Sequence, residues 1–166
     1  ICLSIPRQRQ ICIKDRGLPF IRSISTDNIF QAGSSIKGIY EAIGACILKE
    51  NGKKRWGEKT PENILYCDIL ADMFPDAKFL VIRRDPRAVI ASMNKVFFYP
   101  KDVSLNLLNY KFYEQHGYDL ASKYIAKDRK MDILYEELTE NPRSVLDNIF
   151  SFIDEPFEEG VFDFHR

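Results

Sequence analysis

The sequence has few of the residues on which metal sites and disulfide frameworks depend. Its 166 residues include four cysteines and two histidines. The cysteines, at positions 2, 12, 46 and 67, are too widely spaced for a Cys-x-x-Cys metal clip and too few for a disulfide framework in a chain of this length. The two histidines do not combine with them in a zinc-ligand spacing. We therefore expect buried, reduced thiols and no metal site.

The chain also lacks net charge and long apolar runs. It has 24 basic and 24 acidic side chains, so no overall charge favours a nucleic acid or a lipid surface as a partner. The longest apolar stretches, such as 79–82 and 96–99, are far shorter than the ~20 residues of a membrane-spanning helix. With 45% hydrophobic residues, the composition is that of a globular protein. We expect one domain over 1–166, no transmembrane segment and no nucleic-acid partner.

A signal peptide is also absent from the opening residues. The chain begins with Ile1 rather than Met, and no charged segment or small-residue cleavage site follows. We interpret the sequence as a fragment that is partial at both ends. The lack of disulfide spacing and of Asn-x-Ser/Thr sites favours a cytoplasmic location. The alternative is a signal anchor in a segment that precedes Ile1.

Apolar periodicity and helix-start signals predict several helices. Residues 34–50 carry an apolar stripe with helical spacing, and Asn51-Gly52 is a typical helix end. Thr60-Pro61 predicts the start of a helix that runs to about Phe74, and Asp85-Pro86 predicts another. Further helices are expected over 103–125, interrupted at His116-Gly117, and from Asn141-Pro142 to a stop at Pro156.

Two short apolar segments alternate with these helices and predict an α/β fold with a parallel sheet. Residues 77–82 are apolar apart from Lys78, which is typical of a strand buried on both faces, and 131–135 are predicted to form the second strand. In such a fold the ligand binds at the carboxyl ends of the strands.

An anion site is predicted at the end of the first of these strands. Arg83-Arg84 follows the strand directly, and the helix that starts at Asp85-Pro86 directs its amino terminus into the same space. Ser92, eight residues after Arg84, could turn its hydroxyl toward the same anion. The alternative is that Arg84 forms an ordinary surface ion pair and that Ser92 has no ligand.

Three runs then resemble the sulfotransferases that use 3′-phosphoadenosine-5′-phosphosulfate (PAPS). They are Trp56-Gly57-Glu58-Lys59-Thr60-Pro61, the segment 70–79 and the segment 84–92, and they occur in the family's order. The resemblance implies a P-loop-NTPase-like parallel sheet flanked by helices, PAPS as the sulfuryl donor and no metal. It also implies that Arg84 and Ser92 hold the 3′-phosphate. Tyr135, in a Tyr-Glu-Glu-Leu segment, corresponds to a tyrosine near the adenine and the 3′-phosphate.

Lys59 and Glu58 are the predicted catalytic residues. Lys59 lies where the family commonly places a lysine near the transferring sulfuryl group, and an ammonium there would stabilise charge that grows on the bridging oxygen. Glu58 is either a base for the acceptor hydroxyl or a partner that orients the loop. Trp56 is expected in the core or in a pocket wall. For the aromatic run 97–99, we expect two of the three side chains to lie in the core. The alternative is that the run lines an acceptor pocket.

The main departure from the family is the missing glycine-rich loop that would bind the 5′-phosphosulfate. We therefore expect the fragment itself to be inactive, and no residue is identified as the general base. The acceptor is a hydroxyl or amine on a saccharide, a peptide or a small molecule. The alternatives are a non-catalytic nucleotide- or anion-binding module of the same fold, or a nucleotide kinase, which would need a Gly-x-x-x-x-Gly-Lys-Ser/Thr loop upstream.

Overall fold

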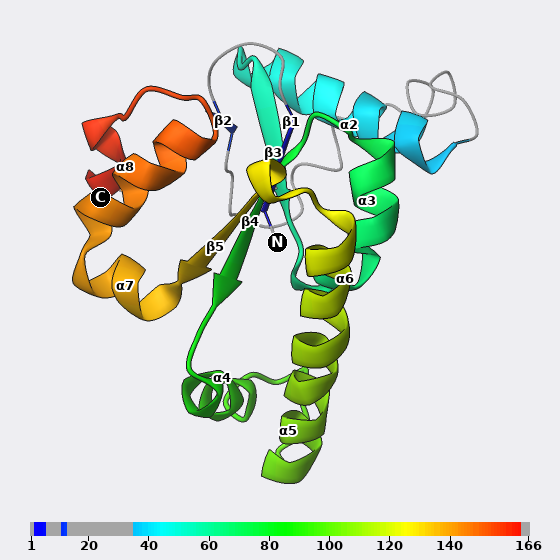
Figure 1. Cartoon of the computed structure of the whole chain (residues 1–166), viewed down its shortest axis with the longest axis vertical. Helices are drawn as coiled ribbons and strands as arrows, with labels where there is room; N and C mark the ends of the chain where they lie inside the picture. Colours follow the sequence, from blue (N-terminus) through cyan, green and yellow to red (C-terminus); the bar gives the residue numbers. More distant parts are fainter. Residues whose placement is uncertain (1, 6–10, 13–34, 164–166) are drawn as a thin grey trace.

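The computed structural model describes residues 2–5, 11–12 and 35–163, and its strands form one mixed sheet (Figure 1). The strands are β1 (Cys2–Ile5), β2 (Ile11–Cys12), β3 (Arg55–Lys59), β4 (Lys78–Arg83) and β5 (Lys130–Leu134). Within the described residues, their order in the sheet is β2-β3-β1-β4-β5. The pairs β2/β3 and β4/β5 are parallel, and β1 lies between β3 and β4, antiparallel to both.

Helices cover the sheet on two sides, as expected for an α/β fold. Figure 1 shows α2, α3 and α6 on one side of the strands and α7 and α8 on the other. The α-helices are α2 (Ile36–Asn51), α3 (Cys67–Met73), α4 (Pro86–Met93), α5 (Val103–Phe112), α6 (Tyr118–Tyr124), α7 (Tyr135–Glu140) and α8 (Pro142–Phe152). Shorter helical turns are η2 (Pro61–Tyr66), η3 (Tyr113–Gly117), η4 (Lys127–Arg129) and η5 (Glu159–Asp163). The predicted α/β fold class is confirmed, but the sheet is mixed rather than parallel throughout, because β1 pairs antiparallel with both of its neighbours.

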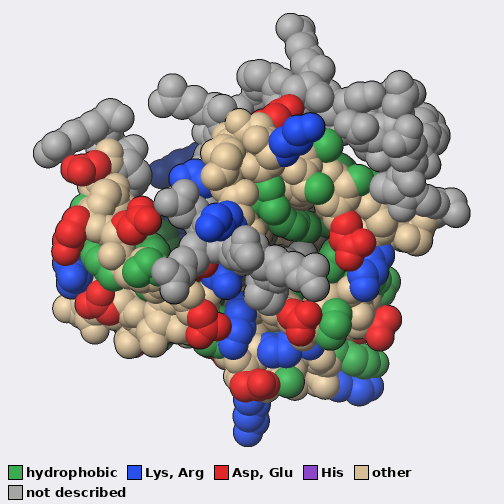
Figure 2. All heavy atoms as spheres, turned by 90° about the horizontal axis from the view of Figure 1, so that it is seen from above, with side chains coloured by type: hydrophobic (Ala, Val, Ile, Leu, Met, Phe, Trp, Pro, Cys, Tyr) green, Lys and Arg blue, Asp and Glu red, His purple; other side chains and the backbone are tan. Residues whose placement is uncertain are grey.

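The surface carries charges of both signs. Figure 2 shows basic and acidic side chains interspersed over the face that it displays, in keeping with the formal net charge of zero.

Helix α2 begins and ends where its sequence signals indicate. The Ser35 hydroxyl accepts a hydrogen bond from the Gly38 amide at 3.1 Å, which satisfies one of the free N–H groups of the first turn. Gly52 ends the helix with a left-handed φ of 59°, a conformation that glycine adopts without a steric penalty. The predicted helix over 34–50 is confirmed.

The region around Thr60 differs from its prediction in two ways. Residues 55–59, for which no regular element was predicted, form strand β3, in which Trp56 is buried and packs edge-on against Phe74 with the ring centroids 6.2 Å apart. The helix expected from Thr60 to Phe74 is divided into the 3₁₀ helix η2 and the α-helix α3. The Thr60 hydroxyl donates to the Glu58 carboxylate rather than capping the helix. The core role predicted for Trp56 is confirmed.

Helix α2 approaches β3 closely through a glycine. A Cβ atom on Gly44 would lie 2.4 Å from the Trp56 ring, closer than side-chain atoms can pack. Only glycine lets the helix backbone lie against the indole, and this contact fixes the distance between α2 and the sheet.

The predicted break at His116-Gly117 is a π-helical turn within one helical column. Helices α5 and α6 are joined by η3, and the column extends beyond the end of the sheet in Figure 1. Gly117 is buried, and a Cβ there would lie 2.8 Å from Ile64 Cγ2. Gly117 therefore serves close packing against η2 rather than helix termination.

The chain after β5 forms two helices where one was predicted. Helix α7 begins at Tyr135, directly after the strand, and α8 begins at Pro142 as expected. Helix α8 ends at Phe152, and Asp154 then adopts a φ of 57° before Pro156.

The core lies against one face of β4. Phe79 and Val81 on this face are fully buried. The buried residues packed with them come from η2, α3 and α6 and include Ile64, Cys67, Leu70, Phe74, Ala121 and Ile125. The prediction that this strand is buried on both faces is wrong, because Ile82 is 51% exposed. Leu80 and Ile82 on the opposite face line a cavity instead.

Candidate active site

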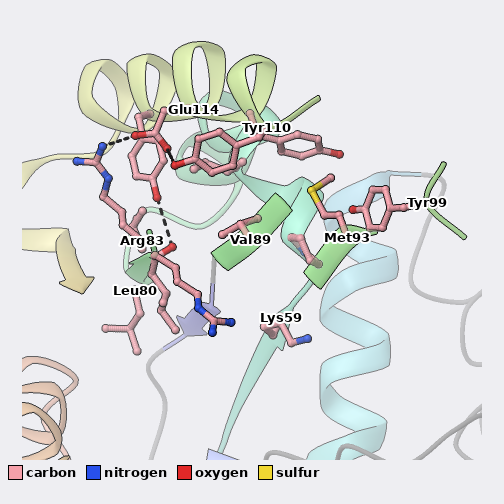
Figure 3. A pocket seen from close by; sticks show the side chains of 15 residues that line it. Lys59, Leu80, Arg83, Val89, Met93, Tyr99, Tyr110 and Glu114 are labelled. Carbon is pink, nitrogen blue, oxygen red and sulfur yellow. Dashed lines mark hydrogen bonds and ion pairs between the residues drawn. The ribbon is translucent and has the colours of Figure 1, made fainter. Parts of the chain in front are cut away.

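A cavity of about 330 Å³ lies at the carboxyl end of β4 (Figure 3). Its wall is formed by η2, β4, α4 and the column α5-η3-α6, together with Lys59 at the end of β3. The cavity is therefore at the strand end where the sequence predicted ligand binding. Its lining is Lys59, Pro61, Ile64, Leu80, Val81, Ile82, Arg83, Arg84, Val89, Met93, Tyr99, Tyr110, Tyr113, Glu114 and Tyr118.

Most of this lining is apolar or aromatic. Val89 and Met93 come from α4, and Figure 3 shows both between Lys59 and Tyr110. Four tyrosines line the cavity, at positions 99, 110, 113 and 118. Such a surface binds a flat apolar group, and its hydroxyls supply a few oriented polar contacts.

Arg83 is neutralised within the cavity wall. Its guanidinium forms an ion pair with Glu114 and lies over the Tyr118 ring, 4.4 Å from the centroid. The Glu114 carboxylate also accepts a hydrogen bond from the Tyr110 hydroxyl at 3.0 Å (Figure 3). The carboxylate raises the pKa of the Arg83 guanidinium. Arg83 is therefore a structural cation rather than part of an open anion site.

The tyrosine hydroxyls of this wall are protonated donors at neutral pH. Burial, reinforced by the bond to Glu114, raises the pKa of Tyr110 to about 12. Burial likewise raises the pKa of Tyr118, whose hydroxyl donates to the Ile82 carbonyl at 3.3 Å. These hydrogen bonds fix the orientation of both rings.

Arg84 and Tyr135 are brought together by the pairing of β4 with β5. The ladder ends with Arg83 opposite Leu134, so the next residue of each strand lies beside the other. The Arg84 guanidinium stacks over the Tyr135 ring with its central carbon 4.3 Å from the ring centroid. Arg84 is exposed and also lines the cavity.

The amino terminus of α4 contributes less to an anion site than the sequence suggested. The Asp85 carboxylate accepts a hydrogen bond from the Arg87 amide at 2.8 Å and forms an ion pair with the Arg87 guanidinium. These bonds to Arg87 lower the pKa of Asp85 to about 2, so the cap stays ionised until the pH falls toward that value. Pro86 has no N–H, and the N–H of Arg87 is taken by Asp85, so Arg84 is the main attraction for an anion here.

Ser92 lies further along α4 in an exposed position. It does not belong to the cavity lining found among the described residues. Its assignment to the 3′-phosphate stays a prediction from the resemblance.

Lys59 and Glu58, at the end of β3, have different surroundings, which indicate different roles. Lys59 is exposed and lines the same cavity as Arg84 (Figure 3). Glu58 accepts hydrogen bonds from the Thr60 hydroxyl and from the Asn63 side-chain amide, one at each carboxylate oxygen. The carboxylate thus ties β3 to η2, which favours the loop-orienting role over that of a base.

Sequence reasoning missed most of the aromatic wall. Of the run 97–99, only Tyr99 lines the cavity, and the expected core role for two members is wrong because Phe97 and Phe98 are 92% and 68% exposed. Tyr110, Tyr113 and Glu114 were not identified. Their spacing places them on one helical face, but only the packing of the α5-η3-α6 column over β4 shows that this face borders a cavity.

Comparison with known proteins identifies the family. The family model described as "Sulfotransferase family" matches residues 22–159, most of the chain. The chain belongs to the sulfotransferase family. It is also 28% identical over 126 residues to a protein-tyrosine sulfotransferase of Drosophila melanogaster, an alignment that covers 69% of this chain and 24% of the relative. The chain thus spans about a quarter of the length of this curated relative.

Two further findings concern the described residues of this sulfotransferase chain. Among the described residues, no group of three or more His, Cys, Asp or Glu side chains is arranged to hold a metal ion. No helix in this part of the chain is long and apolar enough to cross a membrane.

Proposed function

We propose that this chain forms the nucleotide-binding part of a sulfotransferase that transfers a sulfuryl group from PAPS to a hydroxyl or amine acceptor. The observation that carries the proposal is that Lys59 and the Tyr135-stacked Arg84 line one cavity at the end of β4. The family match supports the same reaction.

The charges of the cavity fit an anionic nucleotide. Three cations, Lys59, Arg83 and Arg84, face a single carboxylate, Glu114, which leaves the lining with a net charge of +2. Because Glu114 is paired with Arg83 and Asp85 with Arg87, neither carboxylate neutralises Arg84. Arg84, supported by Tyr135 and with Ser92 on α4, would hold the 3′-phosphate.

Catalysis in this scheme depends on positioning and on charge. The acceptor oxygen or nitrogen forms the new bond to sulfur as the bond from sulfur to the bridging oxygen breaks, and negative charge grows on that oxygen. The acceptor gives up its proton to water, and the 3′-phosphorylated nucleotide leaves. The Lys59 ammonium stabilises the growing charge, and Glu58 holds the turn that carries Lys59. Positioned in this way, Lys59 acts on the transition state more than on the bound nucleotide.

A transfer assay tests the proposed reaction. A protein that joins this chain to a 5′-phosphosulfate loop is incubated with sulfur-labelled PAPS and a panel of phenols, saccharides, peptides and amines. We expect label to appear on an acceptor over many turnovers. Tight binding of the 3′-phosphorylated nucleotide without transfer would instead identify a non-catalytic nucleotide-binding module.

The tyrosine-lined cavity supports an aromatic hydroxyl as the acceptor. A saccharide needs many polar partners, whereas here the Tyr110 and Tyr118 hydroxyls are already engaged within the wall. The apolar floor of Leu80, Val89 and Met93 suits a ring. The similarity to a protein-tyrosine sulfotransferase is in keeping with this class.

Filling the cavity should therefore raise the KM for a phenol selectively. Val89→Phe places a ring where the acceptor ring would lie, and we expect the KM for a simple phenol to rise roughly 10-fold or more, the equivalent of losing ~1.5 kcal/mol of apolar burial. The KM for PAPS should stay unchanged in the same assay. The matched control is Ile90→Phe on the next residue of α4, which is not part of the described cavity lining. An equal rise in both variants would contradict the assignment.

A further inference from the structure

Helix α7 contacts both residues that begin the loop after β4. Its first residue, Tyr135, supports the Arg84 guanidinium, and its second, Glu136, accepts a hydrogen bond from the Asp85 amide at 3.0 Å. Glu136 is half-buried, and although it belongs to the Tyr-Glu-Glu-Leu segment, no role was predicted for it.

The contacted amide belongs to the peptide bond that joins Arg84 to Asp85. Fixing this peptide restricts the backbone torsions on both sides of it and therefore the direction in which the Arg84 side chain leaves the chain. The Tyr135 ring then restricts the plane of the guanidinium. A long side chain that is already oriented loses less conformational entropy when it binds a ligand.

A carboxylate beside an anion site needs an explanation, because its charge opposes phosphate binding. The hydrogen bond that the Glu136 carboxylate accepts from the Asp85 amide provides this explanation. The amide N–H would otherwise lie at the start of α4 without a helical partner, and a carboxylate is a stronger acceptor for it than a neutral group. The electrostatic cost is offset if the bond holds Arg84 in its binding orientation.

We propose that Glu136 is a positioning residue of the nucleotide site, which acts by holding the Arg84-Asp85 peptide so that Arg84 meets the 3′-phosphate. The proposal rests on the proposed function for the ligand of Arg84. It extends the site beyond the cavity lining to the first turn of α7.

Calorimetric titration of the 166-residue chain with adenosine 3′,5′-bisphosphate and with adenosine 5′-monophosphate tests this role. Glu136→Ala should weaken binding of the bisphosphate about fivefold, the effect of one lost hydrogen bond, and that of the monophosphate less than about twofold. Glu136→Gln should bind at least as tightly as the unmodified chain, because the amide oxygen accepts the same N–H and the opposing charge is removed. Glu137→Ala, an exposed neighbour on the same helix, is the matched control.

A double-mutant cycle separates positioning from a structural effect. Once Arg84 is replaced by alanine, Glu136→Ala should weaken bisphosphate binding no further. An equal loss in both backgrounds, or equal losses for both nucleotides, would overturn the proposal, as would a glutamine variant that binds as weakly as the alanine variant. If Glu136→Ala lowers the melting temperature, Glu136→Asp keeps the charge but draws the carboxylate back by one methylene, and we expect the same selective loss.

The outcome for the unmodified chain distinguishes the two proposals. If it binds the bisphosphate no more tightly than the monophosphate, the proposed function fails. If it prefers the bisphosphate and Glu136→Ala leaves the size of that preference unchanged, only the role of Glu136 fails.

Discussion

Replacing Lys59 with alanine is expected to lower kcat by about 10²–10³, the effect of removing one donor to a developing oxyanion. Lys59 lines the cavity beside Arg84 but is exposed, so its loss should leave the fold intact. Its partner is charge that appears during transfer, so nucleotide affinity should change much less than turnover. The measurement is steady-state kinetics with labelled PAPS in a protein that joins this chain to a 5′-phosphosulfate loop.

The matched control for Lys59 is Lys54→Ala. Lys54 precedes β3, is exposed and lies outside the cavity lining among the described residues, so kcat should stay unchanged. A large loss of nucleotide affinity with an unchanged kcat would place Lys59 in ground-state binding instead.

The parts of the fold that could be predicted are those set by local signals. Ser35 and Gly52 at the ends of α2, and Asp85 before α4, act on backbone groups within a few residues, so the sequence nearby contains the whole signal. Strand β4 was found for a similar reason, because its apolar run needs burial. Only its degree of burial was wrong, because the face with Ile82 borders a cavity.

The missed elements depend on distant partners. Strand β3 contains the polar residues Arg55, Glu58 and Lys59 and forms by pairing with β1 and β2 and by burying Trp56. Helix α7 is six residues long, too short to show helical periodicity. Such elements are stabilised by tertiary packing, which a local pattern does not contain.

The candidate site likewise combines residues that local sequence signals identify with contacts that depend on distant partners. Arg84 could be found from its place after an apolar strand, and its pairing with Tyr135 follows once the register of β4 and β5 is known. The ion pair of Arg83 with Glu114 spans 31 residues of sequence, and nothing near either residue indicates it. The pairing of Arg83 with Glu114, which makes Arg84 the proposed anion ligand at this strand end, is therefore visible only in the structure.

Arg84→Ala should weaken binding of adenosine 3′,5′-bisphosphate by about 10- to 100-fold, which corresponds to the ~1.5–3 kcal/mol of a charged hydrogen-bond partner. Ser92→Ala should cost less, about two- to tenfold, because a hydroxyl contributes ~0.5–1.5 kcal/mol. Both losses should shrink for adenosine 5′-monophosphate, which lacks the 3′-phosphate. Calorimetric titration of each variant with both nucleotides gives the comparison.

Arg87→Ala is the control that separates a specific contact from the general positive field of this loop. Arg87 has the same charge and lies three residues from Arg84, but it is exposed and paired with Asp85. A long-range field would make the two arginines nearly equivalent, whereas a direct contact with the 3′-phosphate makes Arg84 dominant and leaves Arg87→Ala with only the smaller loss that the freed Asp85 carboxylate causes. Equal losses for Arg84→Ala and Arg87→Ala, or equal losses of Arg84→Ala for both nucleotides, would show that Arg84 does not recognise the 3′-phosphate.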